Sequence, residues 1–322
     1  MAEWLIDEGV GEHRAALVVD GAIVEAAIDR QDERLRVGRI VSATLGERVG
    51  GGAWIGTPAG DAILEAVPPG LSQGRTLLVE IVREAIPEVG RLKPPRARAS
   101  DTAEERQAPT FAERFPNARR LVDHGPDLLE AAGWSALIEE AASGEIDFPG
   151  GHLRFSPTPA MALFDVDGSL PPADLAVAGA RAAALAIRRL TIGGSIGIDL
   201  PTLPKAERAA PTAAIDAILP QPFERTAVNG FGFVQIVRPR PRASIPELVR
   251  ADPALTATLE LLRIATRSIG AIRLVAAPPV IARLEQEPAW IAALSRRIGG
   301  TVALRADATR AISAGHVEPA AS

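Results

Sequence analysis

The chain has 322 residues, of which 47% are apolar and 23% are charged, and its formal net charge at pH 7 is −5. These values are ordinary for a soluble globular protein with a sizeable core, and the length allows two or three domains. Cysteine is absent, which excludes disulfides, thiolate nucleophiles and cysteine-based zinc sites. Because the chain is acidic overall, any nucleic acid would have to bind to local basic patches.

Neither targeting nor histidine-based metal binding is indicated. The start, Met1-Ala2-Glu3-Trp4, leads directly into a strand pattern, and no apolar run reaches 18 residues. We therefore expect a cytoplasmic protein that does not bind a membrane. The histidines are scattered without the paired spacing of metal ligands, and we expect them to be solvated or structural; they are His13, His124, His152 and His316.

The first 90 residues carry strand patterns. Two apolar runs on either side of Asp20-Gly21 predict a β-hairpin, because this dipeptide favours a two-residue turn. Short apolar runs broken by glycine follow, at Gly38–Val41, Gly51–Ile55, Asp61–Leu64 and Leu77–Val82. About five short strands in so few residues favour a small barrel of the OB type, whose strand face commonly binds oligonucleotides. A plain β-subdomain is the alternative.

Residues 91 to 118 predict a linker, since they are rich in Arg, Pro, Ala and Glu and show little apolar periodicity. Arg91 and Lys93 at its basic start are candidate phosphate contacts, although most such charge runs are only solvated. Helical patterns follow near residues 128 to 132 and 134 to 142, and then a turn leads into a strand near 148 to 155.

Two aspartate-bearing segments are the most informative feature of the chain. Ala162–Ser169 contains Asp165 and Asp167, Gly193–Leu200 contains Asp199, and each is an apolar strand pattern that runs into an acidic end. The segment between them predicts one helix. It begins with two prolines, continues with an alanine-rich stretch and two arginines, and is expected to stop at Gly193. A helix of this length joins parallel strands, so both acidic ends would meet at the carboxyl edge of one sheet.

The acidic ends predict a metal site. Asp165 and Asp167 would point to the same face, because side chains alternate along a strand. Three converging carboxylates would repel one another unless a cation lay among them. Mg²⁺ suits this place, because it takes a few carboxylate oxygens and keeps several waters for a phosphate-bearing substrate.

A third strand is predicted at residues 231 to 237, followed by Arg238, Arg240 and Arg242 on a stretch stiffened by proline. These arginines are a second candidate phosphate contact. The rest of the chain predicts a compact α/β end piece with helices near 253 to 268 and 279 to 297. Its strands are expected at residues 272 to 276 and 301 to 305.

The segment Phe164–Leu170 also resembles the first motif of haloacid-dehalogenase-type phosphatases, in which the first Asp is a nucleophile and the second a general acid. That family needs a later acidic pair to hold magnesium, and none follows Asp199. The motif also usually lies near the start of the domain. The phosphatase is therefore the weakest of the alternatives.

In chain order, these segments resemble the ribonuclease E/G family of bacterial endoribonucleases over nearly the whole chain. The colinear features are the opening hairpin, a barrel beginning at Val37-Gly38-Arg39-Ile40, Phe148-Pro149-Gly150-Gly151, the two aspartate segments, and Asn229–Ile236 with its arginines. The resemblance implies an α/β fold of mixed α+β type, in which a mixed RNase H-like and DNase I-like sheet carries an inserted S1 barrel of the OB type.

The resemblance also implies a domain order. It comprises an opening hairpin of the RNase H-like part (1–36), an S1 or OB-like barrel (37–90), a linker (91–118), the rest of the RNase H-like part (119–159), a catalytic DNase I-like part (160–244) and a C-terminal α/β end piece (245–322).

The function implied is magnesium-dependent hydrolysis of single-stranded RNA to 5′-phosphate products, in RNA processing or decay. The aspartates matching Asp165 and Asp199 bind the catalytic Mg²⁺, and the position matching Asp167 is an Asn that helps to position the scissile phosphate. Trp54 matches an aromatic residue that stacks on RNA, with a half-buried core position as the alternative.

This chain departs from the family pattern at several positions. Asp167 replaces the Asn, Pro159 stands where a Glu is expected, Ile63 occupies a second aromatic position, and Val89 occupies a lysine position for which Arg91 or Lys93 could substitute. The zinc-linking cysteines are missing, so we expect no zinc and no zinc-linked tetramer, and a homodimer stays open. The region after the barrel is too short for the full sensor of RNA 5′ ends. These departures leave open an RNA-binding paralogue with little or no catalysis.

Overall fold

The computed structural model describes residues 2–32, 34–88, 90–122 and 124–320. It has a mixed α/β architecture with several sheets and one closed five-stranded β-barrel, which is consistent with an OB-like barrel. The chain forms two compact units, each assembled from separate parts of the sequence. Unit 1 consists of Met1–Gln31, Phe115–Ile138 and Leu248–Ser322, and unit 2 consists of Asp32–Arg114 and Glu139–Glu247.

Unit 1 begins with the predicted hairpin, which is confirmed. Strands β2 (Glu12–Val19) and β3 (Ala22–Arg30) are antiparallel and joined by Asp20 and Gly21, with φ of 50° and 82°. Positive φ at both central residues is the two-residue turn that this dipeptide favours. The four-stranded sheet is completed by β1 (Ala2–Glu8) and by β11 (Arg119–Arg120), which is parallel to β1.

The C-terminal segment completes unit 1. Its elements are α7 (Pro253–Ala265), β18 (Ile272–Ala276), α8 (Pro278–Gln286), α9 (Pro288–Ile298), β19 (Val302–Ala306) and β20 (His316–Pro319). The single helix predicted at 279 to 297 is wrong, because Pro288 starts a new helix after α8 has ended. Nor is the end piece separate: Val10 lies in its hydrophobic core, and a Cβ on Gly11 would lie 2.8 Å from Leu259.

Two helices cross the boundaries between the units along the chain. The helix α3 (Trp134–Ser143) follows the short helix α2 (Leu128–Ala131), as predicted, and α6 (Ile245–Ala251) precedes α7. None of the helices in the described part of the chain has the length and apolar character needed to span a bilayer.

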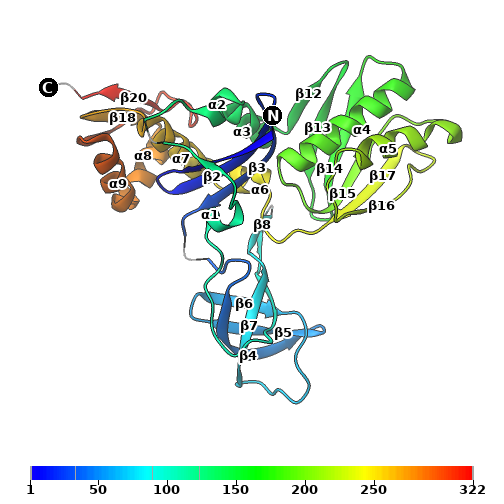
Figure 1. Ribbon diagram of the computed structural model, residues 1–322, viewed down its shortest axis with the longest axis horizontal. Coiled ribbons are helices and arrows are strands. Elements are labelled where there is room, and N and C mark those ends of the chain that lie inside the picture. The colour runs from blue at the N-terminus through cyan, green and yellow to red at the C-terminus, as the bar shows by residue number, and fades with distance from the viewer. Residues whose placement is uncertain (1, 33, 89, 123, 321–322) are drawn as a thin grey trace. The chain divides into compact units, whose positions relative to one another are not determined.

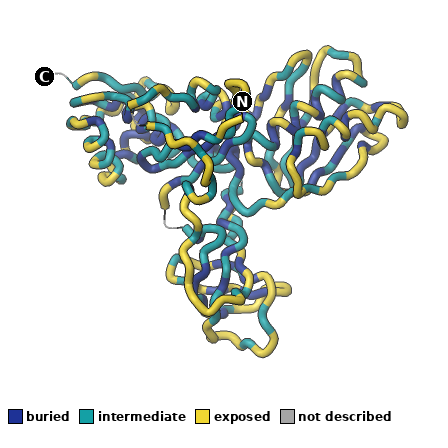
Figure 2. Tube along the Cα trace, in the orientation of Figure 1, coloured by how far each residue is buried: buried dark blue, intermediate teal, exposed yellow. Residues whose placement is uncertain are grey.

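The barrel lies in unit 2 and contains the four predicted strands. They are β4 (Ile40–Val49), β5 (Gly52–Thr57), β6 (Gly60–Leu64) and β7 (Thr76–Arg83). Residues alternate between inside and outside along them, so that Ala53 and Ile55 are buried while Trp54 between them is exposed. Figure 2 shows the buried positions along these strands. This alternation is what the period of two in a half-buried strand requires.

The predicted linker at 91 to 118 is wrong. Residues Arg91–Lys93 form β9, which pairs with β8 (Ile86–Glu88), and Arg96–Ala99 form β10, the strand that closes the barrel between β6 and β7. The short helix α1 (Phe111–Arg114) follows. Ala97 is fully buried in the barrel core. Its side chain is too small to produce a hydrophobic signal among arginines, which is why the strand was missed.

The second sheet of unit 2 has six strands in the order β12-β13-β14-β15-β17-β16. They are β12 (Glu145–Phe148), β13 (Gly151–Pro157), β14 (Ala162–Gly168), β15 (Gly194–Asp199), β16 (Glu224–Arg225) and β17 (Phe233–Arg238). The predicted strand-helix-strand unit is confirmed, since α4 (Pro172–Arg189) joins β14 to the parallel neighbour β15 (Figure 1). The predicted boundary between 159 and 160 is wrong, because β13 pairs with β14 along its length.

The helix α4 covers one face of this sheet. Phe164, Val166 and Ile198 are buried on that face, and a Cβ on Gly179 of α4 would lie 2.3 Å from a methyl group of Val166, so only glycine fits there. The helix ends at Arg189 with Leu190 as its C-cap, and Thr191, with a left-handed φ of 55°, turns the chain away before Gly193, the predicted stop. The side chains of Asp165 and Asp199 alternate with these buried residues and therefore point to the opposite face.

Candidate functional site

Asp165 and Asp199 lie directly beside each other. They are Cα partners in the parallel pair of β14 and β15. Neighbouring strands are about 4.8 Å apart, so the two carboxylates project side by side from one face. Asp199 is the last residue of β15, whereas β14 continues for three residues beyond Asp165. The sequence prediction that the fold would join these two residues is confirmed.

No arginine, lysine or histidine in the described part of the chain neutralises this pair. Among the residues that the structure describes, neither carboxylate has a hydrogen-bond or ion-pair partner, and Arg154, the Cα partner of Asp165 on β13, donates its Nε to Glu145 at 3.2 Å. Partial burial and then the charge of Asp165 raise the pKa of Asp199. The site therefore contains unrelieved repulsion between two like charges, which a bound cation would remove.

Asp167 does not join the pair. Its side chain is 64% exposed and lies 4.0 Å from the imidazole Nε2 of His152, its partner on β13. Within the described ranges, no group of three or more Asp, Glu or His side chains is placed to hold a metal. The predicted convergence of three carboxylates is thus reduced to two, because two residues of strand separate Asp167 from Asp165 by about 7 Å and β15 ends at Asp199.

Two carboxylates suit a magnesium ion better than they suit most other metals. Mg²⁺ is commonly held by one or two carboxylates, with waters and substrate phosphate oxygens completing its octahedron. Zinc in structural sites needs four nitrogen or sulfur ligands, and this sequence has no cysteine. The donor set and the uncompensated charge therefore fit Mg²⁺.

A loop before β17 brings further groups to the same end of the sheet. Phe233 is the Cα partner of Asp199, and the amide N–H of Leu200 donates to the carbonyl of Gly232 at 3.2 Å. Gly232 has φ of 92°, and a Cβ there would lie 2.1 Å from the carbonyl oxygen of Leu200, so this approach requires glycine. Phe231, the next residue toward the loop, is 85% exposed.

A cation lies near the same loop. Arg208 donates its Nε to the carbonyl of Leu203 at 2.9 Å, and its Nη1 lies 4.0 Å from the position that a Cβ on Gly230 would take. Sequence reasoning missed both Phe231 and Arg208. Strand pairing brings Phe231 to the carboxylate end of the sheet, and Arg208 lies near the same loop at Gly230. No local motif signals either placement.

Arg238 at the end of β17, and the arginines after it, lie at the opposite end of that strand from the carboxylates. Because β17 is antiparallel to β15, Arg238 pairs with Gly194 while Phe233 pairs with Asp199. Arg238 donates to the carbonyl of Ile192 at 3.2 Å, and Arg242 donates its Nε to Glu84 at 3.1 Å. A direct role for these arginines at Asp165 and Asp199 is therefore not supported.

Three of the predicted RNA-binding cations gather on one carboxylate. Glu88 accepts hydrogen bonds from Arg91 at 2.9 Å, Lys93 at 2.8 Å and Arg240 at 3.2 Å, and Arg240 also pairs with Glu247. Burial raises the pKa of Glu88, but the bonds from Lys93 and Arg91 outweigh it and lower the pKa to about 2. The structure thus joins two patches that the sequence analysis treated separately, and we call these four residues the Glu88 cluster.

On the barrel, Trp54 is 39% exposed and faces Ile63, its Cα partner on β6. Arg96 of β10 pairs with the other side of Ile63. An aromatic, an apolar and a cationic side chain therefore line one stretch of the barrel surface. Pro159 lies in the turn before β14, and Val89 lies outside the described residues.

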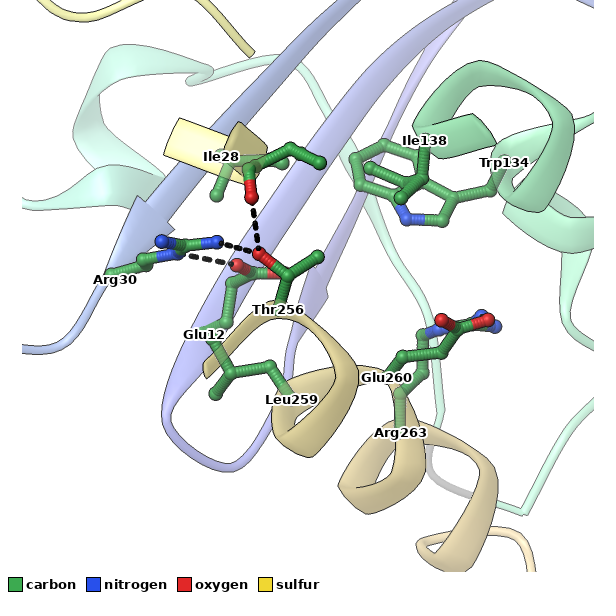
Figure 3. Close-up of a pocket in the computed structure, with 10 residues that line it drawn as sticks. Glu12, Ile28, Arg30, Trp134, Ile138, Thr256, Leu259, Glu260 and Arg263 are labelled. Carbon is green, nitrogen blue, oxygen red and sulfur yellow. Dashed lines mark hydrogen bonds and ion pairs between the residues drawn. The ribbon is translucent and has the colours of Figure 1, made fainter. Parts of the chain in front are cut away.

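A small cavity of about 20 Å³, lined by both polar and apolar side chains, lies within unit 1 (Figure 3). Arg30 spans it, donating to Glu12 at 3.3 Å and to the hydroxyl of Thr256 at 2.8 Å. Burial raises the pKa of both Glu12 and Glu260 there. The cavity has room for about one water molecule, which excludes a nucleotide.

Neither the family models nor the curated proteins that were compared with the chain give a match.

Proposed function

We propose that this protein is a magnesium-dependent endoribonuclease that hydrolyses single-stranded RNA and leaves 5′-phosphate ends. The observation that carries the proposal is the in-register pair Asp165 and Asp199, whose carboxylates have no partner among the described residues. The resemblance to ribonuclease E/G supports it, with the six-stranded sheet as the catalytic, DNase I-like part and the closed barrel as the S1-type part.

Each residue has a role in this proposal. Asp165 and Asp199 hold Mg²⁺, which when bound would activate water and stabilise the charge that develops on the phosphoryl oxygens. Asp167 lies two residues beyond Asp165 on β14, with His152 beside it, and contributes to placing the phosphate or its attacking water. Trp54 on the barrel stacks on a base.

The cations have a different task from the carboxylates. Arg91 and Lys93 contact RNA phosphates away from the reacting bond, and the side chain of Arg91 is 60% exposed. The positive electrostatic field that attracts these phosphates also includes Arg238, Arg240 and Arg242. An RNA phosphate would compete with Glu88 and Glu84 for these cations. We therefore expect their effect on affinity to be modest and strongly dependent on salt.

Replacing either carboxylate tests the proposal. We expect Asp165→Asn and Asp199→Asn each to reduce magnesium-dependent cleavage of an unstructured RNA by about 10²-fold or more, because each weakens the hold on the Mg²⁺ that would stabilise the charge of the transition state. Asp147→Asn, an exposed carboxylate on β12 of the same sheet, is the matched control. Product ends are analysed for the 5′-phosphate. Normal cleavage by both folded Asn variants would contradict the assignment.

An RNA-binding protein with little or no catalysis is the second candidate. Two observations favour it: Asp167 adds a negative charge near the expected phosphate position, and the metal-binding group has only two carboxylates in the part of the chain described. Tight, salt-sensitive RNA binding without metal-dependent turnover would support it. A covalent aspartyl-phosphate on Asp165 after incubation with a small phosphomonoester would instead identify a phosphatase of the haloacid-dehalogenase type.

A further inference from the structure

Phe231 is the most exposed large apolar side chain in the described part of the chain, at 85%. It lies outside the strand, in the turn that precedes β17. Such exposure of a whole phenyl ring leaves apolar surface in water at a cost that no contact within the chain offsets. A ring held in this position is therefore available to a ligand.

The backbone holds the ring in a defined place. Oδ1 of Asn229 accepts the amide N–H groups of Phe231 at 2.8 Å and Phe233 at 3.0 Å, and the carbonyl of Phe231 accepts the hydroxyl of Thr202 at 3.4 Å. The main chain of Asn229 also pairs with Phe233 at 2.9 Å. These bonds order the turn before any ligand arrives, which reduces the entropy lost on binding.

The ring is close to the carboxylate pair. Phe233 is the Cα partner of Asp199, and Phe231 is two residues earlier, so the Cα atoms of Phe231 and Asp199 are at most about 13 Å apart. A nucleotide next to a phosphate at Asp165 and Asp199 is therefore within reach of the ring.

The surroundings of the ring favour a nucleobase over a protein partner. The main chain of Phe231 is hydrogen-bonded to Thr202 and Asn229, and the guanidinium of Arg208 lies beside Gly230. Val237, an exposed apolar residue of β17, lies at the far end of that strand, opposite Ser195. A stable protein interface needs a contiguous surface of about 1,000 Å² or more. One flat ring with a cation nearby matches the π-face and phosphate of a single nucleotide.

We propose that Phe231 is a stacking platform for a base of single-stranded RNA next to the phosphate held at Asp165 and Asp199, with Arg208 near that nucleotide's own phosphate. This inference rests on the proposed function and adds to it the residue that positions the substrate. It predicts a base requirement at one position relative to the cleaved bond.

The test compares Phe231→Ala and Phe231→Trp with the unchanged protein on fluorescein-labelled oligouridylates in which one abasic site is moved along the strand. We expect Phe231→Ala to lower kcat/KM on the intact oligouridylate by about 5- to 150-fold, the range for losing one base–aromatic stack, and Phe231→Trp to retain activity. The kcat/KM of the unchanged protein should fall by the same factor when the base at one particular position is missing. The kcat/KM of Phe231→Ala should not fall further when that same base is missing. Val237→Ala, an exposed apolar residue of β17, is the matched control.

Binding measured by anisotropy without magnesium separates this inference from the proposed function. If no variant cleaves RNA but Phe231→Ala alone binds the oligouridylate more weakly, the platform is supported and the nuclease is not. If the unchanged protein cleaves and Phe231→Ala matches it in kcat/KM and in affinity, the platform is wrong and the nuclease stands. A change in oligomeric state of Phe231→Ala in sedimentation would also overturn the inference, because a second copy of the chain would then cover the ring.

Discussion

At the scale of single residues, the pair Asp165 and Asp199 makes the folded state dependent on pH in an unusual direction. Most folded carboxylates are stabilised in the ionised form, but here partial burial and Asp165 raise the pKa of Asp199 above its ordinary value of 3.8. Between the two values the folded state binds more protons than the unfolded state, so stability falls as pH rises through this window. At neutral pH, Asp199 is ionised in both the folded and the unfolded state, and the full loss of folding stability remains.

We therefore predict that Asp199→Asn stabilises the magnesium-free protein at pH 7, by about 0.2–1 kcal/mol if the repulsion is comparable with other exposed charge pairs. The gain should shrink as the pH is lowered toward 4. Thermal unfolding with and without Mg²⁺ measures both effects. Mg²⁺ at ten times its Kd should stabilise the unchanged protein by about 1.4 kcal/mol and leave Asp199→Asn unaffected. A lower Tm for Asp199→Asn would show that the carboxylate has a stabilising partner.

At the scale of elements, Glu88 connects the β8–β9 hairpin with the segment after β17. Its bonds to Arg91 and Lys93 lie within the hairpin, and its bond to Arg240 crosses to that segment. Because the pKa of Glu88 is lowered to about 2, its contribution to stability is complete above the ordinary value of 4.5 and is lost as the pH falls toward 2. The same carboxylate occupies three cations that RNA could use.

Glu88→Gln should consequently change stability and RNA affinity in opposite directions. We expect a loss of about 1.5–3 kcal/mol, the range for hydrogen bonds to charged groups, together with tighter RNA binding at low salt and a steeper dependence on salt. Urea unfolding and anisotropy titrations over a range of salt concentrations measure the two effects. Glu65→Gln, which breaks the more exposed pair with Arg96, is the control and should cost about 0–1 kcal/mol. Unchanged binding by Glu88→Gln would remove the Glu88 cluster from the RNA surface.

At the scale of the whole molecule, unit 1 depends on one carboxylate that joins three distant segments. Asp127 pairs with Arg14 from the first segment at 2.9 Å, and with Arg263 at 3.2 Å and Arg267 at 3.0 Å from the last. It also caps α2 by accepting the N–H of Glu130. Burial raises the pKa of Asp127, but Arg14 and this cap outweigh it and lower the pKa to about 2.

Asp127→Ala should therefore destabilise unit 1 by about 3 kcal/mol, the lower end of the range for breaking a buried ion pair. Arg14 keeps Asp7 and Arg263 keeps Glu130, so the arginines lose a shared carboxylate without all losing their last partner. Hydrogen exchange measured by mass spectrometry is the suitable readout, since peptides of unit 1 should exchange faster while those of unit 2 change little. Asp127→Asn keeps an acceptor for the cap and separates the helix contribution from that of the ion pairs. Equal changes in both units would mean that they unfold together.

Much of this architecture was predictable because its causes are local. The Asp20-Gly21 turn, the alternation along β4 to β7 and the strand-helix-strand unit around α4 each follow from neighbours within a few residues. The missed elements lacked such a signal. The strand that closes the barrel contributes only the small Ala97 to the core.

The sequence by itself determined that two aspartates would project from adjacent parallel strands. Only the tertiary structure decided which groups surround them: the antiparallel register of β17 sends Arg238 to the far end of the sheet and brings Phe231 and Gly232 to the near end. The end of β15 at Asp199 likewise leaves Asp167 outside the carboxylate pair. The physical reason is that alternation and turn chemistry act within a segment, whereas strand order and register depend on contacts between segments that are far apart in the chain.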